Sequence, residues 1–531
     1  MYSQYNLLQS TKLHEQQYMD TQMVKLGIYS PNRDSLLKAS LECQLHGNYY
    51  VSTSIAEIME TDCEGVLIVE EDAELMSIAL MNYANAIAEG ADFVYSDEVY
   101  GANLETTCFR SEPLDCKCTH VAMVSKKLFL KVIEKTNDIH RMICVAAQLA
   151  TNVNYIPSAL VSYRRPIVAS DLFSENKKRA LVLCHEFSMT GAPIVLVSAM
   201  PILKSKGYEV VVVGPEYDGA TQLFLETGVT VIVNEQRMHD DSVYGIALHS
   251  DFVLANTVVE ADSVGMLSGS SVPVLWWLHD AFLGYPFIEH RLPKRQADNV
   301  KICAVGKHAT AAMHSVRSDF EIEQLIYGLP DYAKDDFEWH DFKVEKEKVF
   351  FAIVGSFETR KGQDILAEAI SMLSPEEVAK TVFLFVGNVL EQSVFLEVEK
   401  LVEKYPENVQ YIRRLTRDEI KSLMSQCSGV ICSSTDDPMP TFVTEAAMFG
   451  KPGIVSEHTG TAGLITPGKN GFIYHNDDPV ELCQMIREVI KNSEQLEKMH
   501  AECRLFYEQN FTKEVFEKTL VKYMEDIVNN R

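Results

Sequence analysis

The chain is poor in positive charge. Its 531 residues contain 48 Lys and Arg against 75 Asp and Glu, which gives a net charge of −27 at pH 7. Because a nucleic-acid surface needs clustered Lys and Arg, this balance argues against a nucleic-acid partner. It also weakens the case for broad attachment to anionic lipid.

Long apolar runs are missing as well. No stretch of about 18 apolar residues occurs, so we expect no membrane span. The N-terminal stretch MYSQYNLLQSTKLHEQQ is polar and lacks the apolar core of a signal peptide. The twelve Cys are scattered, and several lie inside apolar runs, such as Cys184, Cys303 and Cys432. This pattern favours reduced thiols in a cytoplasmic protein over a disulfide framework.

One group of metal-ligating residue types stands out in the first part of the chain. Cys116, Cys118 and His120 form a tight Cys-x-Cys-x-His. A structural zinc site needs a further pair at similar spacing, and none accompanies this group. We therefore expect no metal site.

Length and composition predict several globular domains. A chain of this size is too long for one core, and apolar residues make up an ordinary 47% of it. A Pro followed by a charged run over 166–178 reads as a linker. We divide the chain into domains at 1–165, 179–340 and 341–511, and a final helix at 512–531.

Apolar strands alternate with helical stretches in the second and third domains. A strand over 179–187, a helix over 194–207 and a strand over 208–214 form a βαβ unit, which implies a parallel sheet. The third domain repeats the alternation, with apolar runs at 349–355, 381–387, 409–414, 428–434 and 451–457. Two such domains predict two Rossmann-like folds, with ligand at the carboxyl ends of the strands.

The stretch from Gly429 to Gly471 carries the strongest functional pattern. An apolar run is followed by a Pro-bracketed loop and then by a helix whose first turn we expect to carry Glu445. This layout aims a helix N-terminus at a loop of phosphate size. Asp437 stands eight positions before Glu445. A second block, GSFETRKGQD, places Lys361 where it could meet the same phosphates.

These two blocks resemble the retaining glycosyltransferases of family 4, which have the GT-B fold. Their signature is an acidic residue, seven residues and then Glu, following a short Lys-Gly block, and the resemblance covers about 179–531. It implies transfer of a sugar from a nucleotide-sugar donor, most often a UDP-sugar, to a glycan, lipid-linked or protein acceptor. No cofactor is implied.

The resemblance assigns roles to the acidic and basic residues of the two blocks. Glu445 would accept hydrogen bonds from the ribose hydroxyls, and Asp437 would face the donor sugar, although the family more often has the longer Glu there. Lys361 would neutralise charge on the leaving diphosphate. The alternative is that Asp436 and Asp437 are solvated turn acids and that Glu445 is a helix-start acid favoured by the dipole.

Further donor-side residues follow from the same comparison. Pro440, Thr441 and Phe442 open the helix, and their backbone would hold the diphosphate without a metal. Ser356 stands where the family usually has Arg, and Arg360 is the candidate to compensate. Gly463 replaces a common Glu, which suggests a change in donor recognition or loop packing.

The acceptor side is assigned to the second domain. His279 ends a buried strand, at the position where the family has a His beside donor sugar and acceptor. Gly191, in the loop SMTGAP, would allow close backbone approach to a phosphate or acceptor. Asn256 and Thr257 end another strand and could line the same side.

The first domain resembles another family in part. Strands expected over 65–71 and 91–97, around a helical stretch, resemble the middle of family 2 glycosyltransferases, which have the GT-A fold. Glu70 and Asp72 match its metal-binding Asp-x-Asp. The chain before this motif is too short for an intact nucleotide pocket. We therefore predict a smaller, degenerate α/β domain, used for assembly, acceptor docking or contact with a partner protein or second copy.

Two other functions remain open from the sequence. The enzyme could be bifunctional, with an active first domain, or the chain could be a non-catalytic nucleotide-binding scaffold. Sugar-nucleotide epimerases share the GT-B fold, but the acid-x7-Glu and Lys-Gly blocks follow the transferase pattern.

Overall fold

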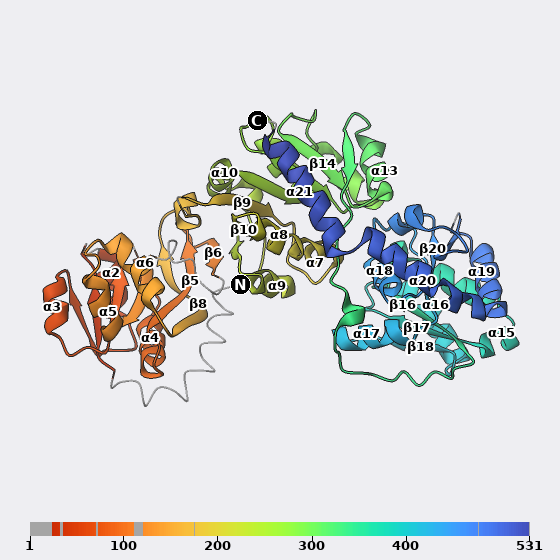
Figure 1. Cartoon of the computed structure of the whole chain (residues 1–531), viewed down its shortest axis with the longest axis horizontal. Coiled ribbons are helices and arrows are strands. Elements are labelled where there is room, and N and C mark those ends of the chain that lie inside the picture. The colour runs from red at the N-terminus through yellow and green to blue at the C-terminus, as the bar shows by residue number, and fades with distance from the viewer. Residues whose placement is uncertain are drawn as a thin grey trace. The chain divides into compact units, whose positions relative to one another are not determined.

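The structure is a computed structural model that describes residues 24–31, 35–70, 73–110, 120–174, 176–475 and 477–529. Figure 1 labels its helices and strands. The chain divides into two compact units. Unit 1 comprises Met1–Met189 and Leu203–Val253, and unit 2 comprises Thr190–Ile202 and Leu254–Arg531. Two elements contain a division point, α8 (Ala199–Ser205) and β12 (Phe252–Asn256).

A mixed sheet forms the centre of unit 1. Its strand order there is β9-β10-β11-β6-β5-β7-β3-β1-β2, and β8 pairs with β4 and β5. The strands are β1 (Leu26–Tyr29), β2 (Tyr49–Ser52), β3 (Gly65–Val69), β4 (Ala73–Leu75), β5 (Phe93–Tyr100), β6 (Thr106–Phe109), β7 (Val121–Ser125), β8 (Val153–Tyr163), β9 (Lys178–Leu183), β10 (Tyr208–Gly214) and β11 (Thr230–Val233).

Helices accompany this sheet and bury its apolar side chains. They are α2 (Ser35–Glu42), α3 (Ile55–Glu60), α4 (Ala79–Ala88), α5 (Lys126–Ile133), α6 (Ile139–Leu149), η3 (Ala169–Asp171), α9 (Gly219–Glu226), η4 (Arg237–His239) and α10 (Asp241–Leu248). Phe129 of α5 and Met142 of α6 are fully buried in one core cluster with Phe93 and Tyr95 of β5. Burial of these side chains is the main stabilising contribution that the helices make.

An antiparallel pair inside unit 1 joins two parts that the sequence separates. Strand β6, from the predicted first domain, pairs with β11, from the predicted second domain, and the register sets Ile232 opposite Cys108. The Nδ2 group of Asn234 also donates to Thr106 Oγ1 over 2.9 Å. The intervening segment 166–178, predicted as a linker, contains η3 and the buried side chains of Leu172 and Phe173.

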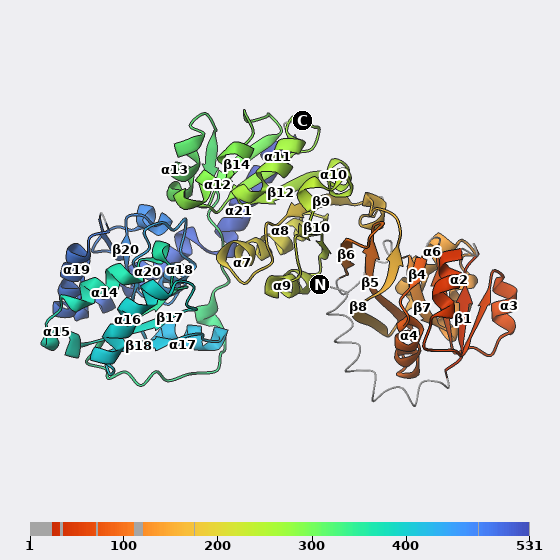
Figure 2. The same cartoon turned by 180° about the vertical axis from the view of Figure 1, so that it is seen from behind.

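Unit 2 holds two sets of parallel strands. The first has the order β15-β14-β13-β12, with β13 (Val274–Leu278), β14 (Val300–Ala304) and β15 (Ile322–Gln324). Helical elements around it include α7 (Gly191–Val197), η5 (Val258–Glu260), α11 (Ala261–Leu267), η6 (Phe282–Gly284), α12 (Tyr285–Ile288), η7 (Glu289–Arg291) and α13 (Lys307–Val316), several of which Figure 2 labels.

The second set is a parallel sheet of order β18-β17-β16-β19-β20-β21. Its strands are β16 (Val349–Val354), β17 (Thr381–Val386), β18 (Val409–Ile412), β19 (Gly429–Cys432), β20 (Gly453–Ser456) and β21 (Gly471–Tyr474). The helical elements are η8 (Tyr332–Lys334), η9 (Thr359–Lys361), α14 (Gln363–Ser371), α15 (Pro375–Ala379), α16 (Gln392–Lys404), α17 (Arg417–Gln426), α18 (Thr441–Met448), η10 (Gly460–Leu464), α19 (Pro479–Lys491) and α20 (Ser493–Asn510).

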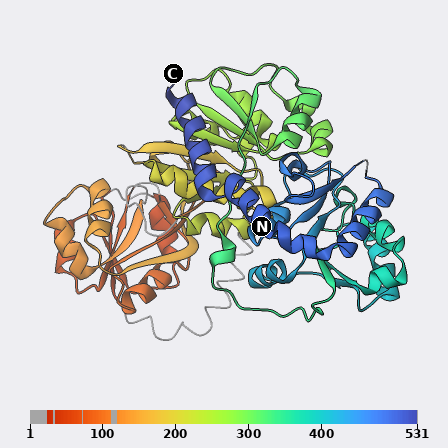
Figure 3. The same cartoon turned by 45° about the vertical axis from the view of Figure 1, so that its right-hand side comes forward.

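The last helix lies against the first set of strands. Helix α21 (Lys513–Asn529) contacts β13 and β14, and Figure 3 shows it in dark blue beside the green strands. The buried rings of Phe516 and Trp277 stack with centroids 5.3 Å apart. The Tyr523 hydroxyl donates to the Gln324 carbonyl over 3.2 Å.

Two expected helices differ in the structure. The stretch 194–207 is not one helix, because α7 ends at Val197 and α8 begins at Ala199. Pro201 explains the change, since a proline within a continuous helix would remove a backbone hydrogen bond. In the first domain the helical stretch expected from Leu75 begins at Ala79, and Leu75 is instead the last residue of strand β4.

Candidate functional site

Two neighbouring strand ends bring Lys361 and Asp437 together. Strands β16 and β19 pair in parallel, so the segments that follow them leave the same edge of the sheet. Lys361 Nζ lies 2.5 Å from Asp437 Oδ2, and the Asp437 side chain is 5% exposed. Gly362 ends η9 with φ of 61°, where a Cβ would meet the Ser433 carbonyl oxygen at 2.2 Å. A glycine at position 362 therefore allows the backbone next to Lys361 to approach the end of β19 closely.

Asp437 is also fixed through its own backbone. Its second carboxylate oxygen accepts from the Met439 amide over 3.2 Å. Its amide donates to the His458 carbonyl, and its carbonyl accepts from the Gly460 amide. The alternative of a solvated turn acid is wrong for this residue, because the side chain is buried and ion-paired.

Asp436 is buried too, and it faces elements of the other strand set in unit 2. Its carboxylate accepts from the amides of Phe282 and Leu283 over 3.1 and 2.7 Å, and from His308 Nε2 over 2.8 Å. Burial opposes ionisation, but these hydrogen bonds outweigh it and hold the pKa of Asp436 below its usual value. The sequence pattern gave Asp436 no such role.

Glu445 lies in the second turn of α18, not the first. Helix α18 begins at Thr441, and its first turn contains no acidic residue. The helix dipole therefore contributes little to this carboxylate, since the effect falls off beyond the first turn. Its partner is Arg417, whose Nη1 lies 3.0 Å from Glu445 Oε1. Burial raises the pKa of Glu445, and the Arg417 charge acts against that rise.

The side chains of Ser356, at the position of the usual family Arg, and of Arg360, the candidate to compensate for it, both contact Glu358 and not the acidic loop. Ser356 donates through Oγ to Glu358 Oε1 over 2.7 Å. Arg360 pairs with the same oxygen over 3.0 Å and is 38% exposed. Both side chains are thus engaged with Glu358, and Lys361 is the cation of this block that reaches the acidic loop.

The predicted acceptor-side residues lie at strand ends of unit 2. The His279 ring contacts the Trp277 ring, with centroids 4.3 Å apart. Asn256 is fully buried, and its side-chain nitrogen and oxygen have no hydrogen-bond partner among the described residues. Thr257 has φ of 71°, a strained value for a β-branched residue, and its carbonyl accepts from Trp276 Nε1 over 2.7 Å.

Gly191 comes close to the start of α18. A Cβ at Gly191 would lie 4.0 Å from Thr441 Cγ2. Pro440 is the N-cap of α18, and Phe442 is buried. The structure thus brings a residue of the predicted acceptor side to the helix that carries Glu445.

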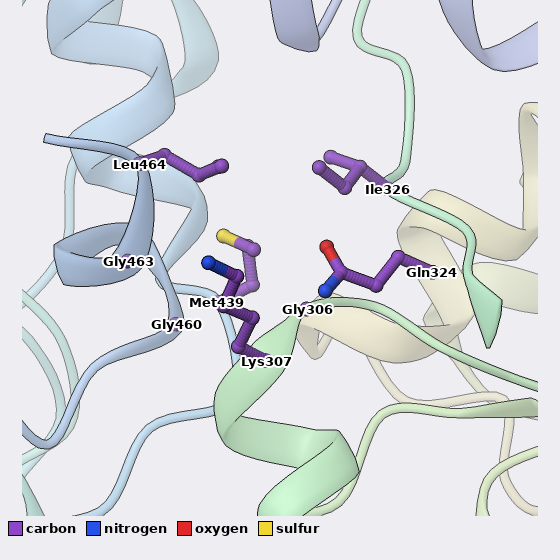
Figure 4. Close-up of a pocket in the computed structure, with 8 residues that line it drawn as sticks. All are labelled: Gly306, Lys307, Gln324, Ile326, Met439, Gly460, Gly463 and Leu464. Carbon is purple, nitrogen blue, oxygen red and sulfur yellow. The ribbon is translucent and has the colours of Figure 1, made fainter. Parts of the chain in front are cut away.

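A small cavity lies beside the acidic loop. It is lined by Gly306, Lys307, Gln324, Ile326, Met439, Gly460, Gly463 and Leu464. Figure 4 shows Lys307 from the start of α13 and Gln324 from the end of β15. A Cβ built on Gly463 would lie 3.6 Å from Cδ of Lys307. A lysine stem therefore lies beside the glycine that replaces the common family Glu.

The predicted metal motif of the first domain is only partly visible. Glu70 contacts His120 Nδ1, and His120 Nε2 lies 2.9 Å from Asp171 Oδ1. Asp72, Cys116 and Cys118 lie outside the described residues. Within the described ranges no cluster of metal-ligating side chains is found, and no helix there is long and apolar enough to span a bilayer.

Two family models match this chain in succession. The model for glycosyl-transferase family 4 matches residues 176–326, and that for glycosyl transferases group 1 matches residues 335–505. These two segments are therefore glycosyltransferase domains, the first of the family 4 type and the second of group 1. Its first domain, before residue 176, lies outside both matches, so the predicted GT-A likeness of that domain stays a prediction.

Curated relatives of this chain are distant. An uncharacterized glycosyltransferase of Methanocaldococcus jannaschii is 28% identical over 148 residues, which is 27% of this chain and 39% of the relative. Spore coat protein SA of Bacillus subtilis is 27% identical over 172 residues, which is 31% of this chain and 45% of the relative. The matches thus span less than half of each relative.

Solved structures confirm the predicted GT-B architecture. Anabaena HepE, solved with UDP and glucose, is 18% identical with a TM-score of 0.54, over 66% of this chain and 100% of that one. Sucrose-phosphate synthase from Thermosynechococcus elongatus is 13% identical with a TM-score of 0.56, over 67% and 100%. At these identities the likeness shows the fold of the glycosyltransferase domains and nothing finer.

Proposed function

We propose that the chain transfers a sugar from a nucleoside diphosphate sugar to an acceptor, with retention at the anomeric carbon. The observation that carries the proposal is the Lys361–Asp437 ion pair at the adjoining ends of β16 and β19. A UDP-sugar is the proposed donor, and the similar fold of HepE, which was solved with UDP-glucose, supports it.

The proposed chemistry uses the chain's own charges. The Lys361 ammonium would neutralise the charge that builds on the leaving diphosphate, and the amide groups at the start of α18 would add to it. Asp437 would hold Lys361 until the donor arrives and then face the sugar. An acceptor hydroxyl would form the new bond on the face that the diphosphate leaves, and a departing phosphate oxygen would take its proton.

The acceptor side is proposed to include His279, Gly191 and Asn256. These residues lie at the ends of strands or at a helix start, where a reacting hydroxyl could approach the donor. The acceptor would be a glycan, a lipid-linked sugar or a protein, which share a hydroxyl nucleophile.

We further infer that the first domain is not a second active centre. The contact of Glu70 with His120 supports this, because it ties up a carboxylate that a GT-A site would offer to a metal. Ala at both Glu70 and Asp72 should leave sugar transfer intact. Loss of a second, metal-dependent activity in that variant would contradict the inference.

Removal of Lys361 tests the main proposal. Lys361→Ala should lower the turnover of donor hydrolysis or transfer by about 100-fold or more, since one electrostatic contact to a developing anion is worth about that much. The measurement is release of UDP from UDP-sugars, with and without divalent metal.

Lys400→Ala is the matched control, because Lys400 is an exposed lysine on α16 that pairs with Glu397 of the same helix. Its turnover should equal that of the natural protein. Equal activity of Lys361→Ala and Lys400→Ala, or no hydrolysis of any nucleotide sugar by the natural protein, would contradict the proposal.

A further inference from the structure

Arg417 begins helix α17 and lies against the carboxylate of Glu445. The distance from its Nη1 to Glu445 Oε1 is 3.0 Å. The Glu445 side chain is 12% exposed, whereas that of Arg417 is 56% exposed. Among the described residues Arg417 is the hydrogen-bond partner of this side chain. The orientation of the buried carboxylate therefore depends on a guanidinium that reaches it from the surface.

Tyr332 supports the guanidinium from another element. The Arg417 Cζ atom lies 4.7 Å from the centre of the Tyr332 ring, in the segment η8 between the two strand sets of unit 2. A planar cation over an aromatic face is attracted to it. The Tyr332 amide donates to Met448 Sδ over 3.0 Å. Contacts thus run from Met448 to Tyr332, from Tyr332 to Arg417 and from Arg417 to Glu445. Because Met448 and Glu445 both belong to α18, this series of contacts begins and ends on one helix.

We propose that Arg417 positions Glu445 for the ribose of the nucleotide donor, and that Tyr332 holds Arg417 in place. The inference rests on the donor site proposed above. Arg417 is a positioning residue, since it acts through Glu445. By binding one oxygen of the carboxylate, it restricts rotation of the charged group and leaves the other oxygen to accept from the ribose hydroxyls. Hydrogen bonds to a charged carboxylate are about twice as strong as neutral ones, so charge and orientation both matter.

The charged surroundings of Glu445 give this role a pH signature. Burial raises the pKa of Glu445, and Arg417 counteracts that rise. Nearby ionisable groups include Tyr327 and Tyr332, whose pKa values burial raises, and Asp437 and Asp335, whose charges act on these two Tyr. Lys421 lies 5.7 Å from the Tyr332 ring centre. Both Tyr are neutral at ordinary pH. Removal of Arg417 takes away the charge that lowers the pKa of Glu445. The pKa therefore rises further, and Glu445 stays protonated to a higher pH.

Binding of UDP and 2′-deoxy-UDP to Arg417→Gln tests the proposal. Calorimetry gives both dissociation constants at about pH 6 and about pH 8.5. The natural protein should prefer UDP by about tenfold or more, the value of a hydrogen bond to a charged group. Arg417→Gln should lose most of this preference at the lower pH and regain part of it at the higher pH. Arg417→Lys, which keeps the charge, should lose less.

Two further variants separate position from general charge. Arg414→Gln removes an exposed positive charge from the segment just before α17 and should keep the full preference for UDP. Tyr332→Phe keeps the ring and should behave like the natural protein, whereas Tyr332→Leu should weaken the preference.

Two results would overturn the inference. One is an equal, pH-independent loss of UDP and 2′-deoxy-UDP binding in Arg417→Gln, which would mark Arg417 as merely structural. The other is an unchanged preference for UDP in that variant. Failure of the natural protein to bind UDP would overturn the proposed donor itself. ADP and GDP with their 2′-deoxy forms then provide the same comparison, and failure of all three removes the donor site and this inference together.

Discussion

At the scale of single residues, three buried carboxylates in unit 2 have different kinds of partner. Asp437 faces an ammonium, Glu445 faces a guanidinium, and Asp436 faces two backbone amides and a His. Removing one partner of a buried charge costs several kcal/mol, because the remaining charge is left uncompensated. Variants of the partners should therefore act mainly through the carboxylates.

His120 allows a pH test at this scale. Burial disfavours its cation, yet the hydrogen bonds to Asp171 and Glu70 prevail and raise the pKa of His120 to about 9. A group with a raised folded pKa stabilises the fold fully below its unfolded pKa of about 6.5, and this contribution is lost as pH rises through about 9.

His120→Gln should therefore lower the free energy of unfolding by about 3 kcal/mol near pH 6, and by much less near pH 10. Urea unfolding of both proteins at the two pH values measures this. His249→Gln is the control, since His249 is exposed and its ring bonds to the Gly245 carbonyl, one helical turn away. A difference that does not shrink with pH would contradict the assigned charge.

The sequence predicted the site residues unequally. Lys361 and Asp437 follow apolar strands and belong to local patterns, so their strand-end positions could be read from the chain. Arg417 and His308 could not, because their partners lie 28 and 128 residues away. The only local sign of Arg417 was the Thr416 capping box, which marks a helix start but not what the helix faces.

At the scale of elements, buried strands were the most predictable part. The runs around β10, β16 and β17 appear within one residue of their expected limits, because apolar residues bounded by Gly or Lys leave few alternatives. Helix limits were less predictable. Glu445 falls in the second turn because Pro440 serves as N-cap and the helix begins after it.

The attachment of α21 gives a prediction at this scale. Phe516 is 1% exposed and stacks on the fully buried Trp277. Phe516→Ala should lower the free energy of unfolding by about 3–5 kcal/mol, the usual cost of emptying an aromatic site in a core. Urea unfolding followed by tryptophan fluorescence measures it.

Lys518→Ala, on an exposed position of the same helix, should change that free energy by less than about 0.5 kcal/mol. Because Ala is a strong helix former, neither variant weakens the helix itself. Similar losses in the two variants would therefore contradict a specific contribution of the aromatic contact.

At the scale of the whole molecule, the net charge of −27 sets a salt dependence. A large net charge destabilises a compact state by self-repulsion, and salt screens it over about 10 Å at 0.1 M. Raising KCl from about 0.02 to 0.2 M should therefore raise the thermal midpoint, by about 1 °C for each kcal/mol gained, since the unfolding entropy grows with chain length.

Choline chloride at equal ionic strength separates screening from ion binding, and it should give the same rise. A midpoint that stays constant or falls in both salts would show that local ion pairs, not overall repulsion, dominate the response.

The pairing of β6 with β11 affects how this chain can be divided. The family 4 match begins at residue 176, so it contains β11 but not β6. A fragment that starts there would expose an edge strand at Val231–Val233. The amide and carbonyl groups of this edge pair with Thr107–Phe109 in the whole chain. An exposed edge strand can pair with a strand of another chain, and such pairing leads to aggregation. Strand β6 therefore protects the edge of β11, and a fragment that starts at residue 176 should aggregate more readily than the whole chain.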